Sequence, residues 1–161
     1  MRKKLYFFTV FFLILSISGC TGYKPIFSSS NTKFKITDYE ITGDKNLGNQ
    51  IYSRLYNLTR SADDSPNTKN IYVSIEVSKA KKAAVKNSAG KILSYKINLS
   101  TKINVRDDVS NNQILNETFV FSSTYTVQDQ YSETIKLENK SLENLINETY
   151  EDLLIKLIEN I

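Results

Sequence analysis

The stretch LSYKINLSTKINV, residues 93–105, decides the fold. Apolar and polar side chains alternate along it. The apolar set comprises Leu93, Tyr95, Ile97, Leu99, Ile103 and Val105, and the polar set comprises Ser94, Lys96, Asn98, Ser100, Lys102 and Asn104. Because successive side chains of a strand point to opposite faces of a sheet, this pattern predicts a long strand with one dry and one wet face.

Similar alternation on both sides of this stretch predicts its partner strands. Residues 71–77 alternate between apolar and polar side chains, and a weaker pattern continues to Val85. The turn 87–90 then joins this strand to residues 93–105 as a hairpin. Residues 115–127 predict a further strand after a turn at 107–113, and residues 34–41 predict the first strand, with a bulge where the alternation shifts.

Two segments show the 3.6-residue period of a helix instead. The first apolar stripe comprises Leu47, Ile51, Leu55 and Leu58. It predicts a helix of about four turns, with Asp44 or Asn46 as its cap. The second stripe comprises Ile135, Leu142, Ile146, Thr149, Leu153 and Leu157. It predicts a helix of about 30 residues, roughly 45 Å long, that runs from about Gln128 to the end of the chain. The polar stretch 61–70 between the first helix and the second strand predicts a loop.

A long helix in water needs a surface for its apolar stripe, and the dry face of the sheet offers one. We therefore expect an α+β fold, a two-layer sandwich. Its four-stranded, mostly antiparallel sheet carries two helices packed on one face, in the order β-α-β-β-β-α. The predicted single domain spans residues 33–161.

The first 19 residues have the pattern of a secretory signal. Three basic residues, Arg2, Lys3 and Lys4, precede the 13-residue apolar run 5–17, and the small residues Ser18 and Gly19 follow. The apolar run is too short to cross a bilayer core, which takes about 20 helical residues. Cys20, the only cysteine, comes directly after the small pair.

Composition excludes several kinds of chemistry. The chain has no histidine, which removes histidine triads, imidazole proton shuttles and most catalytic zinc sites. Four glycines remain after the signal, and none lies in a phosphate-binding pattern. Of the 21 Lys and Arg residues, 18 remain after residue 19, against 17 Asp and Glu, so the net charge is +1. This charge does not support attraction of the whole molecule to nucleic acid. We expect a protein that is not an enzyme and holds no metal, although a Ser–Lys or carboxylate-pair enzyme stays formally open.

The run Ile17-Ser18-Gly19-Cys20 resembles the lipobox of bacterial lipoproteins. The resemblance implies cleavage before Cys20, a diacylglyceryl thioether on its sulfur and an acyl chain on its amine. Three chains would hold the protein firmly in a membrane, because each buried methylene adds about 0.8 kcal/mol. The alternative is an ordinary secretory signal with a chance cysteine. The lipobox resemblance also implies that residues 20–32 are the lipidated end and a tether. Lipoproteins kept in the inner membrane often carry aspartate at the position of Thr21, so this residue favours the outer membrane.

The whole chain resembles the LptE family of lipopolysaccharide-assembly lipoproteins, in its alphaproteobacterial form. After the cysteine, this form has a Gly-aromatic-x-Pro-aliphatic-aromatic motif, which residues 22–27 match, with Thr21 as an inserted residue. Residues 84–99 are similar to the family's central hairpin, and Gln130-Tyr131-Ser132 resembles the entry to its final helix. The resemblance implies a non-enzymatic plug in the lumen of the outer-membrane β-barrel LptD, and a partner in its assembly. Together the two deliver lipopolysaccharide to the outer leaflet.

Lysines gather around the predicted hairpin turn, although the domain is nearly neutral. The candidate set comprises Lys79, Lys81, Lys82, Lys86 and Lys91. Ammonium groups are point-charge partners for phosphate, so these residues are candidates for binding lipopolysaccharide. The alternative is that they protect an exposed hairpin from aggregation. The wet faces, rich in Ser, Thr, Asn and Lys, suit the polar lumen of a barrel, but a solvated sheet would carry the same residues.

A second function class stays open at this point. An unrelated envelope lipoprotein with the same architecture would bind a small ligand or a periplasmic partner instead of a barrel. A periplasmic hydrolase is disfavoured, because the chain has neither histidine nor a usable thiol. The dry-face aromatics Tyr95, Phe119, Phe121 and Tyr125 are expected in the core rather than in a ligand site.

Overall fold

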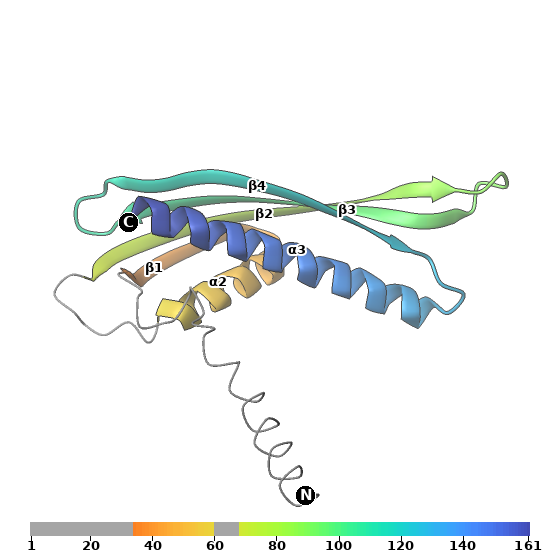
Figure 1. Ribbon diagram of the computed structural model, residues 1–161, viewed down its shortest axis with the longest axis horizontal. Helices are drawn as coiled ribbons and strands as arrows, with labels where there is room; N and C mark the ends of the chain where they lie inside the picture. The colour runs from red at the N-terminus through yellow and green to blue at the C-terminus, as the bar shows by residue number, and fades with distance from the viewer. Residues whose placement is uncertain (1–33, 60–67) are drawn as a thin grey trace, which may run out of the picture.

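The computed structural model describes residues 34–59 and 68–161 (Figure 1). The elements in chain order are β1 (Phe34–Gly43), α2 (Lys45–Thr59), β2 (Lys69–Lys86), β3 (Ile92–Asp107), β4 (Gln113–Thr126) and α3 (Tyr131–Asn160). The strands form one sheet in the order β1-β2-β3-β4, in which β1 pairs parallel to β2 and the other pairs are antiparallel. Both helices lie on the same face of this sheet. The predicted α+β class and the order β-α-β-β-β-α are confirmed.

Gly43 and Asp44 make the turn from β1 into α2. Gly43 has φ +74°, a conformation that L side chains rarely adopt, and the backbone N–H of Asp44 donates to the carbonyl of Val77, 2.8 Å away. One carboxylate oxygen of Asp44 then accepts the N–H of Leu47 at 3.2 Å, so Asp44 is the helix cap. Because α2 carries the chain back across the sheet, β2 runs parallel to β1.

The core lies between the sheet and the two helices. Ile97, Leu99, Ile103 and Val105 of β3 are fully buried, as their alternation predicts. The predicted bulge of β1 is present as a register shift between Ile36 and Asp38. In the core, Phe119 and Tyr125 are buried, and Tyr95 and Phe121 pack against it partly buried, so the expected role of these four aromatics is confirmed.

Two details differ from the sequence prediction. Leu93 was placed on the dry face, but it is 43% exposed, because the β2–β3 hairpin extends past the start of α3 and no helix covers it there (Figure 1). The predicted loop 61–70 also ends earlier: β2 begins at Lys69, where Lys69 and Asn70 pair with the first residues of β1. The predicted signal (1–19), the tether (20–32) with Cys20, and most of that loop lie outside the described residues.

The final helix has the predicted length of 30 residues. Its buried side is formed largely by Leu145, Ile146, Leu153, Leu154 and Leu157. Thr149, on the same side, is fully buried, and its hydroxyl donates to the carbonyl of Leu145 at 2.8 Å, so this buried polar group is satisfied. Each fully buried leucine contributes about 1.5–3 kcal/mol, which holds α3 on the sheet.

Candidate functional site

The sheet face away from the helices, called the open face below, is polar over β3 and β4. Its side chains on these two strands are mainly hydroxyls, amides and lysines: Lys96, Asn98, Ser100, Lys102, Asn104, Asn116, Thr118, Ser122, Thr124 and Thr126. Ser94, which its alternation predicted on the wet face, is instead buried, so it does not belong to this surface. Val120 is the apolar member of this face and is 65% exposed. No carboxylate of β3 or β4 lies in this set. The open face can therefore donate and accept hydrogen bonds over a wide surface with few negative charges.

Charge divides the open face into two halves. In the half where β2 also pairs with β1, Glu76 of β2 lies directly opposite Lys102 of β3, so opposite charges face each other. Toward the hairpin turn, Lys82 of β2 lies directly opposite Lys96 of β3. Like charges placed opposite each other across two strands destabilise a sheet. Both lysines are exposed. Neither takes part in an ion pair among the described residues.

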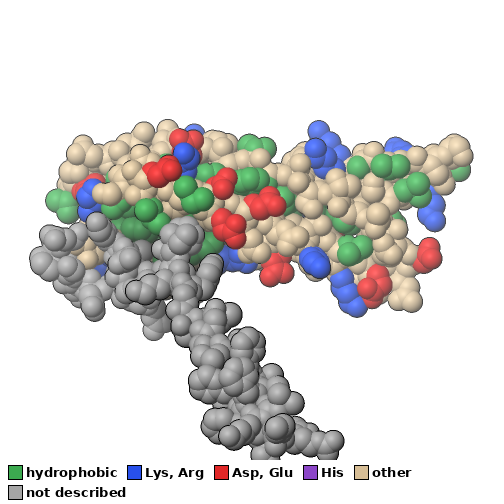
Figure 2. Space-filling view, in the orientation of Figure 1, with side chains coloured by type: hydrophobic (Ala, Val, Ile, Leu, Met, Phe, Trp, Pro, Cys, Tyr) green, Lys and Arg blue, Asp and Glu red, His purple; other side chains and the backbone are tan. Residues whose placement is uncertain are grey.

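The whole hairpin arm, residues 79–96, contains six lysines and no acidic residue. The facing helix α3 contains seven Asp and Glu residues against three lysines. Figure 2 shows acidic side chains over α3 and basic side chains along the half of the molecule that ends in the hairpin. The near-zero net charge of the domain thus hides a separation of charge between the basic hairpin arm and the acidic helix α3.

The five candidate lysines are not equivalent in the structure. Lys79 and Lys81 lie on the helix side of β2, where Lys79 Nζ is 3.9 Å from an oxygen of Asp44. Lys82 projects from the opposite face of the same strand, because neighbouring side chains alternate. Lys86 and Lys91 flank the turn and are exposed. The sequence set omitted Lys96, whose place opposite Lys82 depends on the pairing register.

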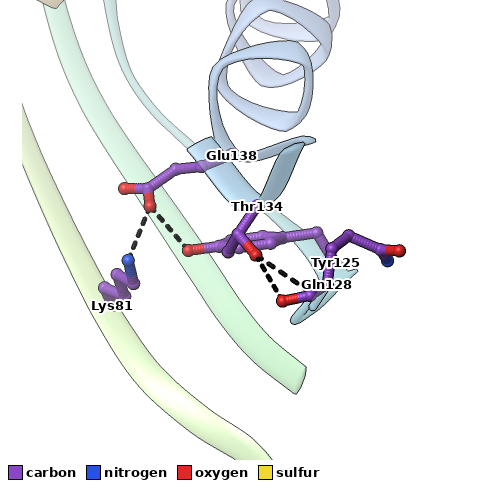
Figure 3. A network of polar contacts seen from close by, with 5 residues as sticks. All are labelled: Lys81, Tyr125, Gln128, Thr134 and Glu138. Atoms are coloured by element: carbon purple, nitrogen blue, oxygen red, sulfur yellow. Dashed lines mark hydrogen bonds and ion pairs between the residues drawn. The ribbon is translucent and has the colours of Figure 1, made fainter. Parts of the chain in front are cut away.

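Lys81 belongs to a cluster that joins three strands to α3, called the Lys81 cluster below (Figure 3). Lys81 Nζ lies 2.6 Å from Glu138 Oε2, and the hydroxyl of Tyr125 donates to the same oxygen at 2.7 Å. Lys81 Nζ also lies 4.4 Å from the ring centre of Tyr95, a cation–π distance. Lys81 of β2 and Tyr125 of β4 thus meet at the carboxylate of Glu138 on α3, and Tyr95 of β3 contacts Lys81.

Protonation in the Lys81 cluster is shifted by these contacts. Burial favours the neutral forms, raising the pKa of Glu138 and lowering that of Lys81. The ion pair outweighs burial in both residues, so the pKa of Glu138 lies below its ordinary value and the pKa of Lys81 above its own. Burial raises the pKa of Tyr125, which keeps its hydroxyl as a donor to Glu138. One feature of the sequence indicated that Glu138 faces the sheet. It lies three residues after Ile135 and four before Leu142, on the apolar stripe of the helix.

A neighbouring pair of contacts fixes the start of α3. Gln130, the first capping position, makes no side-chain hydrogen bond to the helix. The side chain of Thr134 instead bonds to the connection before the helix: its hydroxyl accepts the backbone N–H of Gln128 at 2.8 Å (Figure 3). This hydrogen bond joins the connection between β4 and α3 to the first turn of α3.

Three stacked tyrosines lie between β1 and α2, a feature not predicted from the sequence. The ring of Tyr39 lies 3.9 Å from that of Tyr52, and Tyr52 lies 5.8 Å from Tyr56. Tyr39 and Tyr56 are 46% and 41% exposed. The spacing of Tyr52 and Tyr56, four residues apart on one helix, was the available signal.

A cleft of about 450 Å³ lies between α2 and α3. Acidic and basic side chains both line it, among them Asp44, Arg54, Lys79 and Glu143. The guanidinium of Arg54 also donates to the amide oxygen of Asn147, which connects the two helices. Within the described residues, no group of three or more Cys, Asp or Glu side chains could hold a metal ion. In residues 34–59 and 68–161, no helix is both long and apolar enough to cross a membrane.

No known family model matches this chain, and no curated protein matches it. Solved structures do match. Rare lipoprotein B from Shewanella oneidensis is similar over 76% of this chain and 94% of its own, with a TM-score of 0.53 and 12% identity. A lipoprotein B from Nitrosomonas europaea is similar over 83% of this chain and 88% of its own, with a TM-score of 0.56 and 14% identity. The chain shares the fold of these lipoproteins.

Proposed function

We propose that this chain is an envelope lipoprotein, anchored by an N-acyl diacylglycerol lipid on Cys20 to the outer membrane. In this proposal it plugs an LptD-type β-barrel, helps the barrel to assemble, and aids the insertion of lipopolysaccharide into the outer leaflet. It works as a binding protein without a catalytic site. The lipobox pattern supports the anchor, and the fold shared with rare lipoprotein B supports the class of protein.

The observation that carries the proposal is the chemistry of the open face. A barrel lumen is polar, so a plug needs a broad surface of hydrogen-bonding groups. The open face supplies hydroxyl and amide groups along two adjacent strands, with no carboxylate among them on β3 or β4. Such a surface can pair with the donors and acceptors of a lumen wall, and β3 and β4 add no negative charge to it beside an anionic glycolipid.

The hairpin arm is the proposed contact with lipopolysaccharide. Lys82 and Lys96 face each other at an energetic cost that a bound phosphate would remove, since both ammonium groups can contact one anion. Lys86 and Lys91 lie nearer the turn and extend the positive surface. Lys79 and Lys81 have carboxylate neighbours, so their proposed role is to hold the arm in place.

The test is extraction of the full-length lipidated chain from its native membranes in mild detergent, followed by affinity purification. A large β-barrel that co-purifies at near 1:1 stoichiometry is the expected result. Depletion of the chain should also reduce the amount of folded barrel and of surface lipopolysaccharide. A chain that leaves the membrane alone, with both of these unchanged, would rule the proposal out.

One observation favours a second candidate function. The cleft between α2 and α3 is large enough for a small molecule, and its mixed charges suit a ligand that carries both signs. In that case the chain is an envelope lipoprotein that binds a small ligand or a periplasmic partner. The variant Glu143→Gln distinguishes the two, because it alters the cleft and leaves the open face intact. Its effect on barrel co-purification should be negligible under the first proposal.

A further inference from the structure

Apolar side chains are exposed near the turn of the hairpin arm, beside its lysines. Val85 is 51% exposed and Leu93 is 43% exposed. Lys86 directly follows Val85, and Lys91 lies two residues before Leu93. Figure 2 shows hydrophobic and basic side chains together over the end of the molecule that the hairpin forms. These four residues, called the hairpin end below, make a surface that is both apolar and positively charged.

The pairing of β2 with β3 is irregular at the hairpin end. The register shifts on both sides of Val85, which lies opposite Ser94. If the register of the preceding residues continued, Val85 would lie opposite Leu93. Bulges of this kind redirect side chains and are frequent beside functional sites. The irregular part of the hairpin thus coincides with its exposed apolar side chains.

Side-chain hydrogen bonds hold the turn of the hairpin without adding a negative charge. The amide oxygen of Asn87 accepts the N–H of Ala89 at 3.1 Å and the N–H of Lys91 at 2.9 Å. The turn between β3 and β4 uses a carboxylate for the same purpose, since Asp107 accepts the N–H of Val109 at 3.0 Å. The amide in the hairpin makes equivalent hydrogen bonds and places no anion beside the lysines. The turn is therefore ordered in advance and stays suited to an anionic ligand.

We infer that the hairpin end binds the lipid part of lipopolysaccharide through two kinds of contact. Lys86 and Lys91 contact its phosphate groups, and Val85 and Leu93 contact its acyl chains. The inference rests on the proposed function and adds the acyl chains to it. Ammonium groups are point-charge partners for phosphate. Exposed apolar side chains gain free energy when acyl chains replace the water around them.

The number of lysines favours a glycolipid over a phospholipid as the ligand. Four exposed lysines lie on the arm in addition to Lys79 and Lys81, which have carboxylate neighbours: Lys82, Lys86, Lys91 and Lys96. A phospholipid headgroup has one phosphate to offer them. Lipopolysaccharide combines several phosphate and acidic sugar groups with acyl chains in one molecule, so it matches both the charges and the apolar side chains.

The test compares Val85→Ser/Leu93→Ser with the control Val109→Ser/Val120→Ser. The control also removes two exposed apolar side chains, 87% and 65% exposed, but outside the hairpin arm. The probes are purified lipopolysaccharide and the same molecule stripped of its acyl chains, both titrated onto the full-length lipidated chain in one mild detergent. The ratio of the two affinities should fall at least about fivefold in the first variant and stay unchanged in the control. The proposed anchor on Cys20 is common to all these proteins, so its contribution cancels.

Affinity for the stripped probe shows whether each variant is intact, because that affinity depends on the lysines and should stay at the wild-type level. Barrel co-purification should also equal that of the wild type, so a failure of the barrel proposal is measured separately. The inference is overturned if the affinity ratio is unchanged in Val85→Ser/Leu93→Ser, or if the control lowers it as much. It is equally overturned if phosphatidylglycerol vesicles bind the wild type as tightly as lipopolysaccharide does.

Photo-crosslinking in native membranes gives an independent readout. A photoreactive amino acid in place of Leu93 should attach to an acyl chain of lipopolysaccharide, which mass spectrometry of the joined fragment identifies. The same amino acid in place of Val109 should not attach there. Attachment at Leu93 to phospholipid or protein alone would overturn the inference.

Discussion

Lys82 on β2 and Lys96 on β3 are direct cross-strand partners, so two lysine side chains leave neighbouring strands on the open face. Six residues away on each strand, about 20 Å along the sheet, Glu76 lies opposite Lys102. The same two strands therefore hold one repulsive pair and one attractive pair, whose effects on stability can be compared directly. The repulsive pair lies in the arm proposed to meet an anionic glycolipid.

Replacing one of the paired lysines should stabilise the protein. Lys96→Gln removes the repulsion with Lys82, so the free energy of unfolding should rise by about 0.5 kcal/mol at low salt. The gain should shrink in 1 M salt, where charges are screened within about 3 Å. Urea unfolding at both salt concentrations measures the change. Lys102→Gln is the control, and its stability should fall slightly because it loses the pairing with Glu76. A loss of stability in Lys96→Gln would contradict the repulsion.

The same substitutions should have the opposite effect on binding. In the double variant Lys82→Gln/Lys96→Gln, affinity for purified lipopolysaccharide should fall by about tenfold, and its dependence on salt should weaken. Fluorescence titration of the full-length chain at several salt concentrations measures both quantities. Lys102→Gln again serves as the control, since it removes one charge from the same face outside the hairpin arm. Equal losses in the two proteins would mean that general charge, not the paired lysines, attracts the glycolipid.

The Lys81 cluster should contribute to stability because its carboxylate is only 15% exposed. Glu138→Gln removes the charge that Lys81 and Tyr125 share, so the free energy of unfolding should fall by about 1–2 kcal/mol. Chemical denaturation measures this, and a double-mutant cycle with Lys81→Met isolates the pair. The exposed pair of Lys136 and Glu133 is the control, because Lys136→Gln should change stability by less than about 0.5 kcal/mol. Additive effects of the two substitutions would show that Lys81 and Glu138 do not interact.

The sequence predicted the elements of this fold because their signals are local. Alternation from Tyr95 to Val105 and the stripe from Leu47 to Leu58 each show which side of an element is apolar, and the structure agrees with both. Leu93 follows the same alternation and was assigned wrongly. Its exposure depends on where α3 begins in space, which no pattern within the strand contains.

The candidate site was predicted less completely, since it depends on contacts between distant elements. Lys81 and Lys82 are neighbours in the sequence, yet one lies beside Glu138 and the other opposite Lys96. The register of β2 on β3 and the position of α3 decide this difference. Both are set by residues far away in the chain, so composition around the turn could indicate a positive region but not the arrangement of its charges.

The Lys81 cluster should also give stability a defined dependence on pH. Because the pKa of folded Glu138 lies below its ordinary value of 4.5, its contribution is present above pH 4.5 and is lost as the pH falls through the folded value. The difference in unfolding free energy between the wild type and Glu138→Gln should therefore be constant from pH 6 to pH 8 and shrink below pH 4.5. Urea unfolding across this range measures it. A difference that stays constant down to pH 3 would contradict the assigned shift.

The turn between β1 and α2 should tolerate no side chain at Gly43. A Cβ there would lie 2.1 Å from the carbonyl oxygen of Val77, and the φ of +74° adds backbone strain. Gly90, in the hairpin turn, has a similar φ of +82° but open space around its Cβ position. Gly90→Ala should therefore cost about 1 kcal/mol, the strain alone, whereas Gly43→Ala should cost about 3 kcal/mol or more. Thermal and urea unfolding of the two variants measure the difference. Equal losses of stability in the two variants would mean that β1 and β2 can move apart at Gly43 at no cost in free energy. The close contact between Gly43 and Val77 would then not be needed for the fold.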